Sequence, residues 1–149
     1  MNEKPLTLDE MFKLAERVPL NKWNRSREVT DFGNLSPEVL NFLDVPMTIS
    51  WLFNPHMASW EHEGEANGLK VLLDYSSRDS NFYTYLQIAV LNNGEFIGCS
   101  RRLKESKAPN LYSLYERIRK EIITREKLQG ESRRTNLTNQ GLSVARSLL

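Results

Sequence analysis

A chain of 149 residues that is 40% hydrophobic and 26% charged has the size and composition of one globular domain, which excludes a disordered or fibrous protein. Its single cysteine excludes an intramolecular disulfide, and its longest aliphatic run, residues 88–91, is too short to cross a bilayer. The net charge of +1 hides a division, because residues 1–100 contain 8 basic and 14 acidic residues whereas residues 101–149 contain 12 and 5.

Two helices are predicted in the first third of the chain. Thr7 begins a Thr-x-x-Glu capping box, and the apolar residues after it recur at helical spacing, which predicts a helix over residues 8–17. A Ser-Pro-Glu sequence that starts at Ser36 predicts a second, shorter helix, which ends near Leu43. Residues 20–34 between the two helices are polar with isolated aromatics, and we expect a structured loop or a short edge strand there.

Beyond the second helix the apolar residues alternate with polar ones, which is typical of half-buried β-strands. The strongest signal covers residues 82–91, because this run is rich in β-branched and aromatic side chains. Other predicted strands cover residues 47–53, 69–75 and 95–103, and a weaker candidate covers residues 57–63.

An Asn93-Gly94 turn joins the last two of these strands. A type I′ turn needs positive φ at both central residues, so an Asn-Gly pair predicts a tight hairpin. The register counted from this turn places Ala89 opposite Gly98 and turns Cys99 toward the core. The opposite face of the hairpin then carries Tyr83, Tyr85, Gln87, Ser100 and Arg102.

A long helix is predicted after the sheet. Apolar residues recur at helical spacing from Leu111, Asn110 can cap the helix, and Gly130 is expected to end it. The predicted fold class is therefore α+β, with an antiparallel meander sheet of four or five strands, two N-terminal helices, and a long C-terminal helix packed on the sheet. We expect a single domain over residues 1–130 and a polar, basic extension over residues 131–149.

Residues that could carry chemistry do not form a known pattern in this sequence. His56 and His62 lack the spacing of a helical zinc site, and in an extended segment they would lie about 20 Å apart, so an exposed loop is favoured over a metal site. Cys99 is expected to be an inert buried side chain and not a nucleophile. Phosphate-binding and nucleophile-elbow motifs are also missing. The sequence therefore predicts no catalytic residue, no metal and no cofactor, and an enzyme is the less favoured class.

The most defensible candidate site is a surface on which aromatic residues lie near basic ones. Sheet tyrosines can stack on single-stranded bases, and lysine and arginine side chains can contact phosphates. The long helix would bury the tyrosines instead if it covered the same face. The candidate residues are Tyr83, Tyr85, Arg101, Arg102, Lys104, Arg133 and Arg134.

Two classes of function follow from these observations. The favoured one is a non-enzymatic binding module, such as an adaptor, inhibitor or chaperone-like protein, that contacts a protein partner or another copy of itself. Its anchors would be Trp23, Trp51 and Trp60, or the apolar side chains of residues 142–149. The alternative is a nucleic-acid-binding protein that uses the basic segment 101–134 with the sheet tyrosines. Membrane contact is not expected, and the lack of a signal-peptide pattern predicts a cytoplasmic location.

Overall fold

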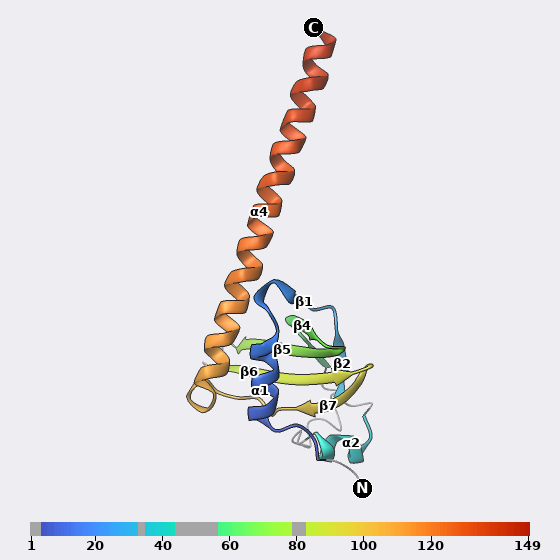
Figure 1. The fold of residues 1–149 in the computed structure, drawn as a ribbon, viewed down its shortest axis with the longest axis vertical. Coiled ribbons are helices and arrows are strands. Elements are labelled where there is room, and N and C mark those ends of the chain that lie inside the picture. Colours follow the sequence, from blue (N-terminus) through green and yellow to red (C-terminus); the bar gives the residue numbers. More distant parts are fainter. Residues whose placement is uncertain (1–3, 33–34, 44–56, 79–82) are drawn as a thin grey trace.

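The computed structural model describes residues 4–32, 35–43, 57–78 and 83–149, and Figure 1 shows the arrangement of the chain. Helices cover Leu8–Arg17 (α1), Pro37–Phe42 (α2) and Pro109–Leu148 (α4), and short 3-10 helices cover Leu20–Lys22 (η1) and Glu105–Lys107 (η3). Strands cover Trp23–Arg25 (β1), Val29–Asp31 (β2), Met57–Ser59 (β3), His62–Ala66 (β4), Leu69–Arg78 (β5), Tyr83–Asn92 (β6) and Glu95–Cys99 (β7).

Five antiparallel strands form the main sheet in the order β1-β4-β5-β6-β7, and β2 pairs with β3 in a separate sheet of two strands. Strands β4 to β7 are consecutive neighbours, so they form the predicted meander, and β1 joins it at the edge from within the predicted loop at residues 20–34. The predicted α+β class, with an antiparallel sheet and a long C-terminal helix, is confirmed. The weak candidate at residues 57–63 is divided between β3 and β4, and the predicted strand at residues 47–53 lies outside the described residues.

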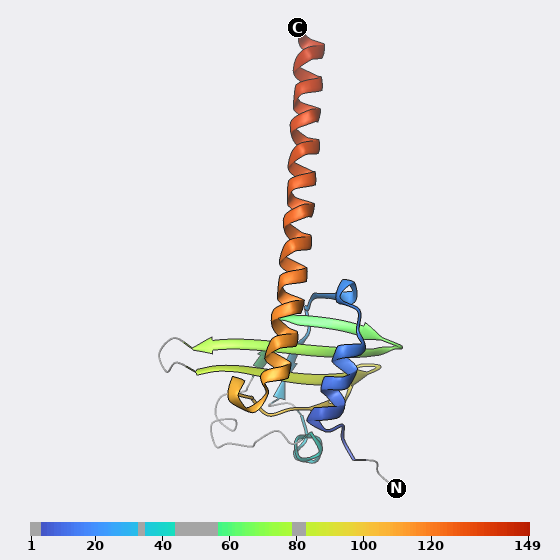
Figure 2. The same ribbon diagram turned by 60° about the vertical axis from the view of Figure 1, so that its left-hand side comes forward.

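Hydrophobic side chains cover the main sheet on both of its faces. On one face, α1 and the first turns of α4 pack against buried residues that include Trp23, Val71 and Ile88, and Figure 2 shows these two helices side by side over the strands. On the other face, residues of α2 pack with Phe32 and Trp60 against the sheet. The sheet is therefore a central layer, and α4 leaves it from one side.

Two hairpins of the sheet close with Asn-Gly turns. Asn93 and Gly94 have φ values of 52° and 83°, which are the positive values expected for the predicted turn between β6 and β7. Asn67 and Gly68 have nearly the same values, 51° and 84°, between β4 and β5. The second turn carries the same sequence signal, although it was not predicted.

The predicted register of the β6–β7 hairpin is wrong beyond its first pairs. Leu91 faces Phe96 as expected, but a β-bulge follows, so Cys99 and not Gly98 lies opposite Ala89. A bulge inserts one residue and turns the following side chains to the other face of the sheet. Cys99 consequently lies in the core cluster beneath α2, and burial raises the pKa of its thiol to about 12, which fits the expected inert side chain.

The predicted end of the long helix is also wrong. Gly130 lies inside α4, which continues without interruption to Leu148. A single glycine costs a helix roughly 1 kcal/mol relative to alanine, and this cost is too small to stop a helix whose neighbouring residues favour it. The boundary between a domain and an extension near residue 130 stays a prediction, but the extension continues the same helix.

Candidate interaction site

The base of α4 is embedded in the fold. The apolar stripe predicted from Leu111 is buried, including Ile118 and Ile122, and it packs on the face of the sheet that α1 also covers. Burying side chains of this size contributes roughly 1.5–3 kcal/mol each. About four turns of the helix are therefore fixed in position by the core.

A polar cluster joins this part of α4 to the sheet. The Tyr115 hydroxyl on α4 donates to the Glu61 carboxylate, at 2.8 Å from Oε2 and 3.0 Å from Oε1. The ring of Tyr75 from β5 stacks on the ring of Tyr115, with centroids 4.8 Å apart and planes 9° from parallel. Burial, followed by the bond to Glu61, raises the pKa of the Tyr115 hydroxyl well above its usual value. The hydroxyl therefore stays protonated and remains a donor.

His62 lies beside this carboxylate at the start of β4. Its side chain is buried, and its Nε2 lies 3.6 Å from Oε1 of Glu61. Within the described part of the chain, its Nδ1 has no hydrogen-bond partner. Burial lowers the pKa of the imidazole, with a smaller opposing effect from Glu61. His62 is consequently neutral at physiological pH.

Replacing Tyr115 by phenylalanine is expected to lower the free energy of unfolding by about 1.5–2 kcal/mol, because hydrogen bonds to charged groups are worth more than neutral ones. Tyr112→Phe is the matched control, since the Tyr112 hydroxyl is paired with the neutral backbone carbonyls of Thr84 and Leu103, at 3.2 and 3.1 Å. Its expected loss is about 1 kcal/mol or less. Urea denaturation followed by fluorescence measures both, and equal losses would show that the bond to Glu61 has no special weight.

A second group of contacts holds α4 at the point where it leaves the sheet. Arg25 on β1 forms a two-pronged ion pair with Glu126, with N–O distances of 2.7 and 2.8 Å. The Arg125 guanidinium donates to the backbone carbonyls of Leu20 and Trp23, at 3.1 and 2.9 Å. Both groups join α4 to the segment that leads from α1 into β1. The direction in which the helix leaves the fold is thereby set.

Beyond Glu126 the helix projects away from the rest of the chain, and Figure 1 shows this part rising clear of the sheet. We call residues 127–148 the arm. Its 22 residues span about 33 Å at 1.5 Å per residue. Every residue of the arm is exposed. The exposed residues include five with large aliphatic side chains: Leu128, Leu137, Leu142, Val144 and Leu148.

The structure divides the sequence-predicted site residues into two groups. Tyr85 is partly buried near the end of the sheet, with the Arg102 guanidinium 4.7 Å from its ring centre, and Arg101 and Lys104 are exposed in the segment that follows β7. Tyr83 begins β6. Arg133 and Arg134 are on the arm, and their distance from the first turn of α4 is about 36 Å of helix. The seven residues therefore do not form one continuous surface.

Two of the three predicted tryptophan anchors are not exposed for binding. Trp23 and Trp60 are both buried in the core, where Trp60 donates to the Thr30 hydroxyl at 2.9 Å. Trp51 and His56 lie outside the described residues. Among the residues that the structure describes, no three histidine, cysteine or acidic side chains are grouped as a metal site would require.

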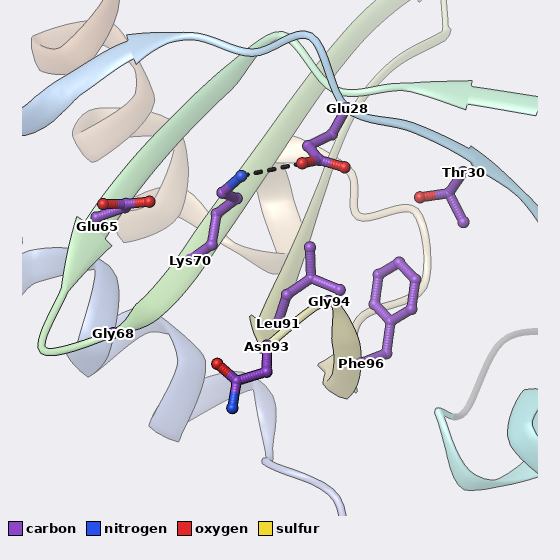
Figure 3. A pocket seen from close by; sticks show the side chains of 9 residues that line it. All are labelled: Glu28, Thr30, Glu65, Gly68, Lys70, Leu91, Asn93, Gly94 and Phe96. Atoms are coloured by element: carbon purple, nitrogen blue, oxygen red, sulfur yellow. Dashed lines mark hydrogen bonds and ion pairs between the residues drawn. The ribbon is translucent and has the colours of Figure 1, made fainter.

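Figure 3 shows a cavity of about 320 Å³ on the face of the sheet that β2 borders, beside the two Asn-Gly turns. Leu91 and Phe96 supply its apolar wall. Lys70 is held by carboxylates, with Nζ 2.9 Å from Glu28 and 3.3 Å from Glu63, and the bond to Glu28 is the main cause of its raised pKa. The charge of Lys70 is thus compensated within the protein, and its role here is to tie the segment before β2 to the sheet.

Comparisons with protein families, with curated proteins and with solved structures found no match to this chain. In the described part of the chain, none of the helices has the length and apolar character needed to span a membrane. The fold and the site together define an α+β domain that carries a rigidly anchored, fully exposed helical arm. The sequence indicated parts of the arm, namely Arg133, Arg134 and the apolar residues of 142–149, but not its continuous helix, because Gly130 was expected to end α4.

Proposed function

We propose that this protein is a protein-binding module in which the folded domain is a rigid base and the arm is the surface that contacts the partner. One observation supports the proposal most directly, namely that 22 consecutive helical residues with five large aliphatic side chains have no packing partner in the described structure. Helices in proteins derive most of their stability from packing of an apolar face. A partner that packs on the arm would supply this stability.

The anchoring of the arm also favours binding over a passive tail. Glu126 and Arg125 fix the exit direction, so the arm is presented in a preferred orientation and loses less rotational freedom when a partner binds. Trp23 and Trp60 do not support the proposal, because both side chains are buried in the core and are not available to a partner. The single cysteine is a free thiol, which suits the reducing, cytoplasmic location that we propose.

A protein partner explains the arm better than a nucleic acid does. Nucleic-acid binding relies on basic residues and stacking rings, but the Tyr85 ring is already covered by Arg102 and lies far from Arg133. Exposed leucine and valine side chains gain nothing from a phosphate backbone, whereas they gain free energy when they are buried against an apolar protein surface. Nucleic-acid binding therefore becomes an outcome that the test must be able to detect.

The experiment places a photo-crosslinking amino acid at Leu137, or at Asn139 on the opposite side of the helix as the matched control, in cells that make the protein. A partner crosslinked from position 137 but not from 139 is then identified, purified and titrated against the full chain and against a chain that ends at Lys127. We expect the shortened chain to lose about a hundredfold or more in affinity. Its melting temperature should change by less than about 2 °C, because every residue of the arm is exposed and none belongs to the described core.

Two results would contradict the proposal. One is equal binding of the partner by the shortened chain, which would place the interface on the folded domain. The other is the absence of a protein crosslink from Leu137 together with salt-sensitive binding of labelled oligonucleotides that is lost when Arg133 and Arg134 are changed to glutamine. The second result would establish the nucleic-acid alternative instead.

A further inference from the structure

One face of α4 repeats with the spacing of a coiled coil. Alternating steps of three and four residues, which are the spacing of a and d positions in a heptad, lead from Leu137 through Gly141 and Val144 to Leu148. The same steps continue backwards through Arg134, Gly130 and Lys127 to Ile123. We call these eight positions the seam. Leu128 and Leu142 occupy another heptad position and lie on a different face.

The first half of the seam is basic. Lys127 and Arg134 are exposed at seam positions that a partner helix would cover, and acidic seam residues are missing from the arm. In a parallel pair of identical chains, equivalent a positions face each other, so each of these cations would meet its own copy. Like charges held together at the centre of an interface oppose association. The seam therefore disfavours a parallel homodimer and is complementary to carboxylates.

Two glycines on the seam lack a reason within the chain itself. A β-carbon added at Gly130 or at Gly141 would have no described atom within 4 Å apart from the adjoining residues and backbone of its own helix. Glycine destabilises a helix relative to alanine, and neither position has positive φ. Small residues at a helix interface allow the partner's backbone to come close. This observation adds to the charge pattern, which identifies the kind of partner.

We infer that the partner segment is an amphipathic helix of a different protein, with acidic residues opposite Lys127 and Arg134 and apolar residues opposite Leu137 to Leu148. The inference rests on the proposed function and specifies its partner. Carboxylates opposite the two cations would set the register of the pair, and the apolar second half would supply most of the buried area. Arg133 and Glu131 flank the seam on opposite sides and offset each other, so the positive charge that selects carboxylates comes from Lys127 and Arg134 on the seam itself.

The test uses the full chain and synthetic helical peptides of four heptads with leucine at the other seam positions. One peptide carries glutamate at two successive a positions near its N-terminal end, which suits parallel pairing. A second carries two glutamates at successive d positions near its C-terminal end, because a positions face d positions in an antiparallel pair. Each has a matched control with lysine in place of the two glutamates. Fluorescence anisotropy should show one glutamate peptide binding about tenfold or more tightly than its lysine control.

Reversing the charges of the arm provides the reciprocal test. The K127E/R134E chain should prefer the lysine peptide, whereas Leu137→Asp should weaken both peptides. Equal affinity for glutamate and lysine peptides, or no binding of either glutamate peptide, would overturn the inference. So would a wild-type chain that is a stable dimer in light scattering and becomes a monomer on Leu137→Asp, because the seam would then be occupied by a second copy.

These outcomes are separable from those of the proposed function. A protein that crosslinks to position 137 and needs the arm for binding, but comes from a segment without acidic residues, would leave the protein-binding function standing and remove the acidic-helix inference. Loss of arm-dependent protein binding would remove both. The peptide preference and the crosslinking result therefore test different statements about the same surface.

Discussion

Replacing Gly64 by alanine is expected to lower the free energy of unfolding by about 2–3 kcal/mol, although only one methyl group is added. A β-carbon at this position of β4 would lie 2.8 Å from the Trp23 ring and 2.8 Å from Cγ1 of Val18. Real carbon contacts do not come this close, so the ring or the strand must move. Trp23 is fully buried and sits on the strand paired with Gly64, and its backbone carbonyl accepts from Arg125. The ring therefore cannot move aside cheaply.

The same substitution at two other glycines separates this clash from the usual effects of glycine. Gly68→Ala meets no atom within 4 Å but must adopt a φ of +84°, which costs an alanine roughly 1–2 kcal/mol. Gly130→Ala meets open space on the arm, so the unfolding of the domain should not change. Urea denaturation of the three variants measures the series. A midpoint for Gly64→Ala equal to that of the wild type would show that Trp23 is not held against β4.

Local sequence rules correctly predicted α1 and the turn between β6 and β7, although the same rules misplaced the end of α4 at Gly130. Thr7 and Glu10 form the expected capping box, with hydrogen bonds of 3.0 and 3.2 Å, and α1 covers the expected residues. The Asn93-Gly94 turn has the expected positive φ values. These features depend on residues at most four positions apart, so the sequence contains the whole of their cause. The overlooked Asn67-Gly68 turn belongs to the same kind and could have been predicted.

Other features depend on contacts that local rules do not contain. The bulge that turns Cys99 to the other face depends on how the two layers of the core fit together, and one extra residue reverses the side chains that follow. The ion pair between Arg25 and Glu126 joins positions 101 residues apart. Both are consequences of tertiary packing, and the sequence pattern of either segment alone does not indicate them.

The candidate site shows the same limit. The sequence groups Arg133 and Arg134 with Arg102 because all three belong to the basic segment 101–134. In the structure, α4 places Arg133 and Arg134 far from the sheet. The seam could have been read from the sequence as a repeat of three and four residues from Ile123 to Leu148. What the sequence cannot show is that these residues remain exposed after the domain has folded, and this exposure is the basis of the proposed function.

Changing Asp74 to asparagine is expected to stabilise the protein at neutral pH. Asp74 lies on β5 opposite Gln87, and burial raises the pKa of its carboxyl to about 6, with a further increase from Glu61 that Arg102 partly offsets. A carboxyl with a raised folded-state pKa favours the fold only while it is protonated. That favourable contribution is complete below the unfolded-state pKa near 3.8 and is lost as the pH rises through about 6. Asparagine removes the cost of ionisation.

The expected gain for Asp74→Asn is about 1–2 kcal/mol at pH 7.5, allowing for solvent screening of a partly exposed group. It should shrink through pH 5 and be absent near pH 4, because the wild-type carboxyl is then protonated in the folded state as well. Asp9→Asn is the control, since Asp9 is exposed in the first turn of α1 and pairs with Lys13 at 2.9 Å. Its removal should lower the stability only slightly at neutral pH, because both side chains of the pair are exposed to solvent. If the gain in stability of Asp74→Asn did not vary with pH, the gain would come from packing and not from ionisation.

His62 affects the pH dependence of stability in the opposite direction to Asp74. The stability of the wild type and of Asp74→Asn should therefore be compared across a range of pH. Burial lowers the pKa of His62, so the unfolded chain binds a proton more readily and the fold loses stability as the pH falls below about 6.5. In the wild type, protonation of Asp74 over the same range works against this loss. Removing the Asp74 carboxyl leaves the His62 effect uncompensated, so the stability of Asp74→Asn should fall more steeply than that of the wild type between pH 6.5 and 4. The base of α4 is therefore expected to be the acid-sensitive part of the fold, because His62 is buried beside the carboxylate that holds Tyr115.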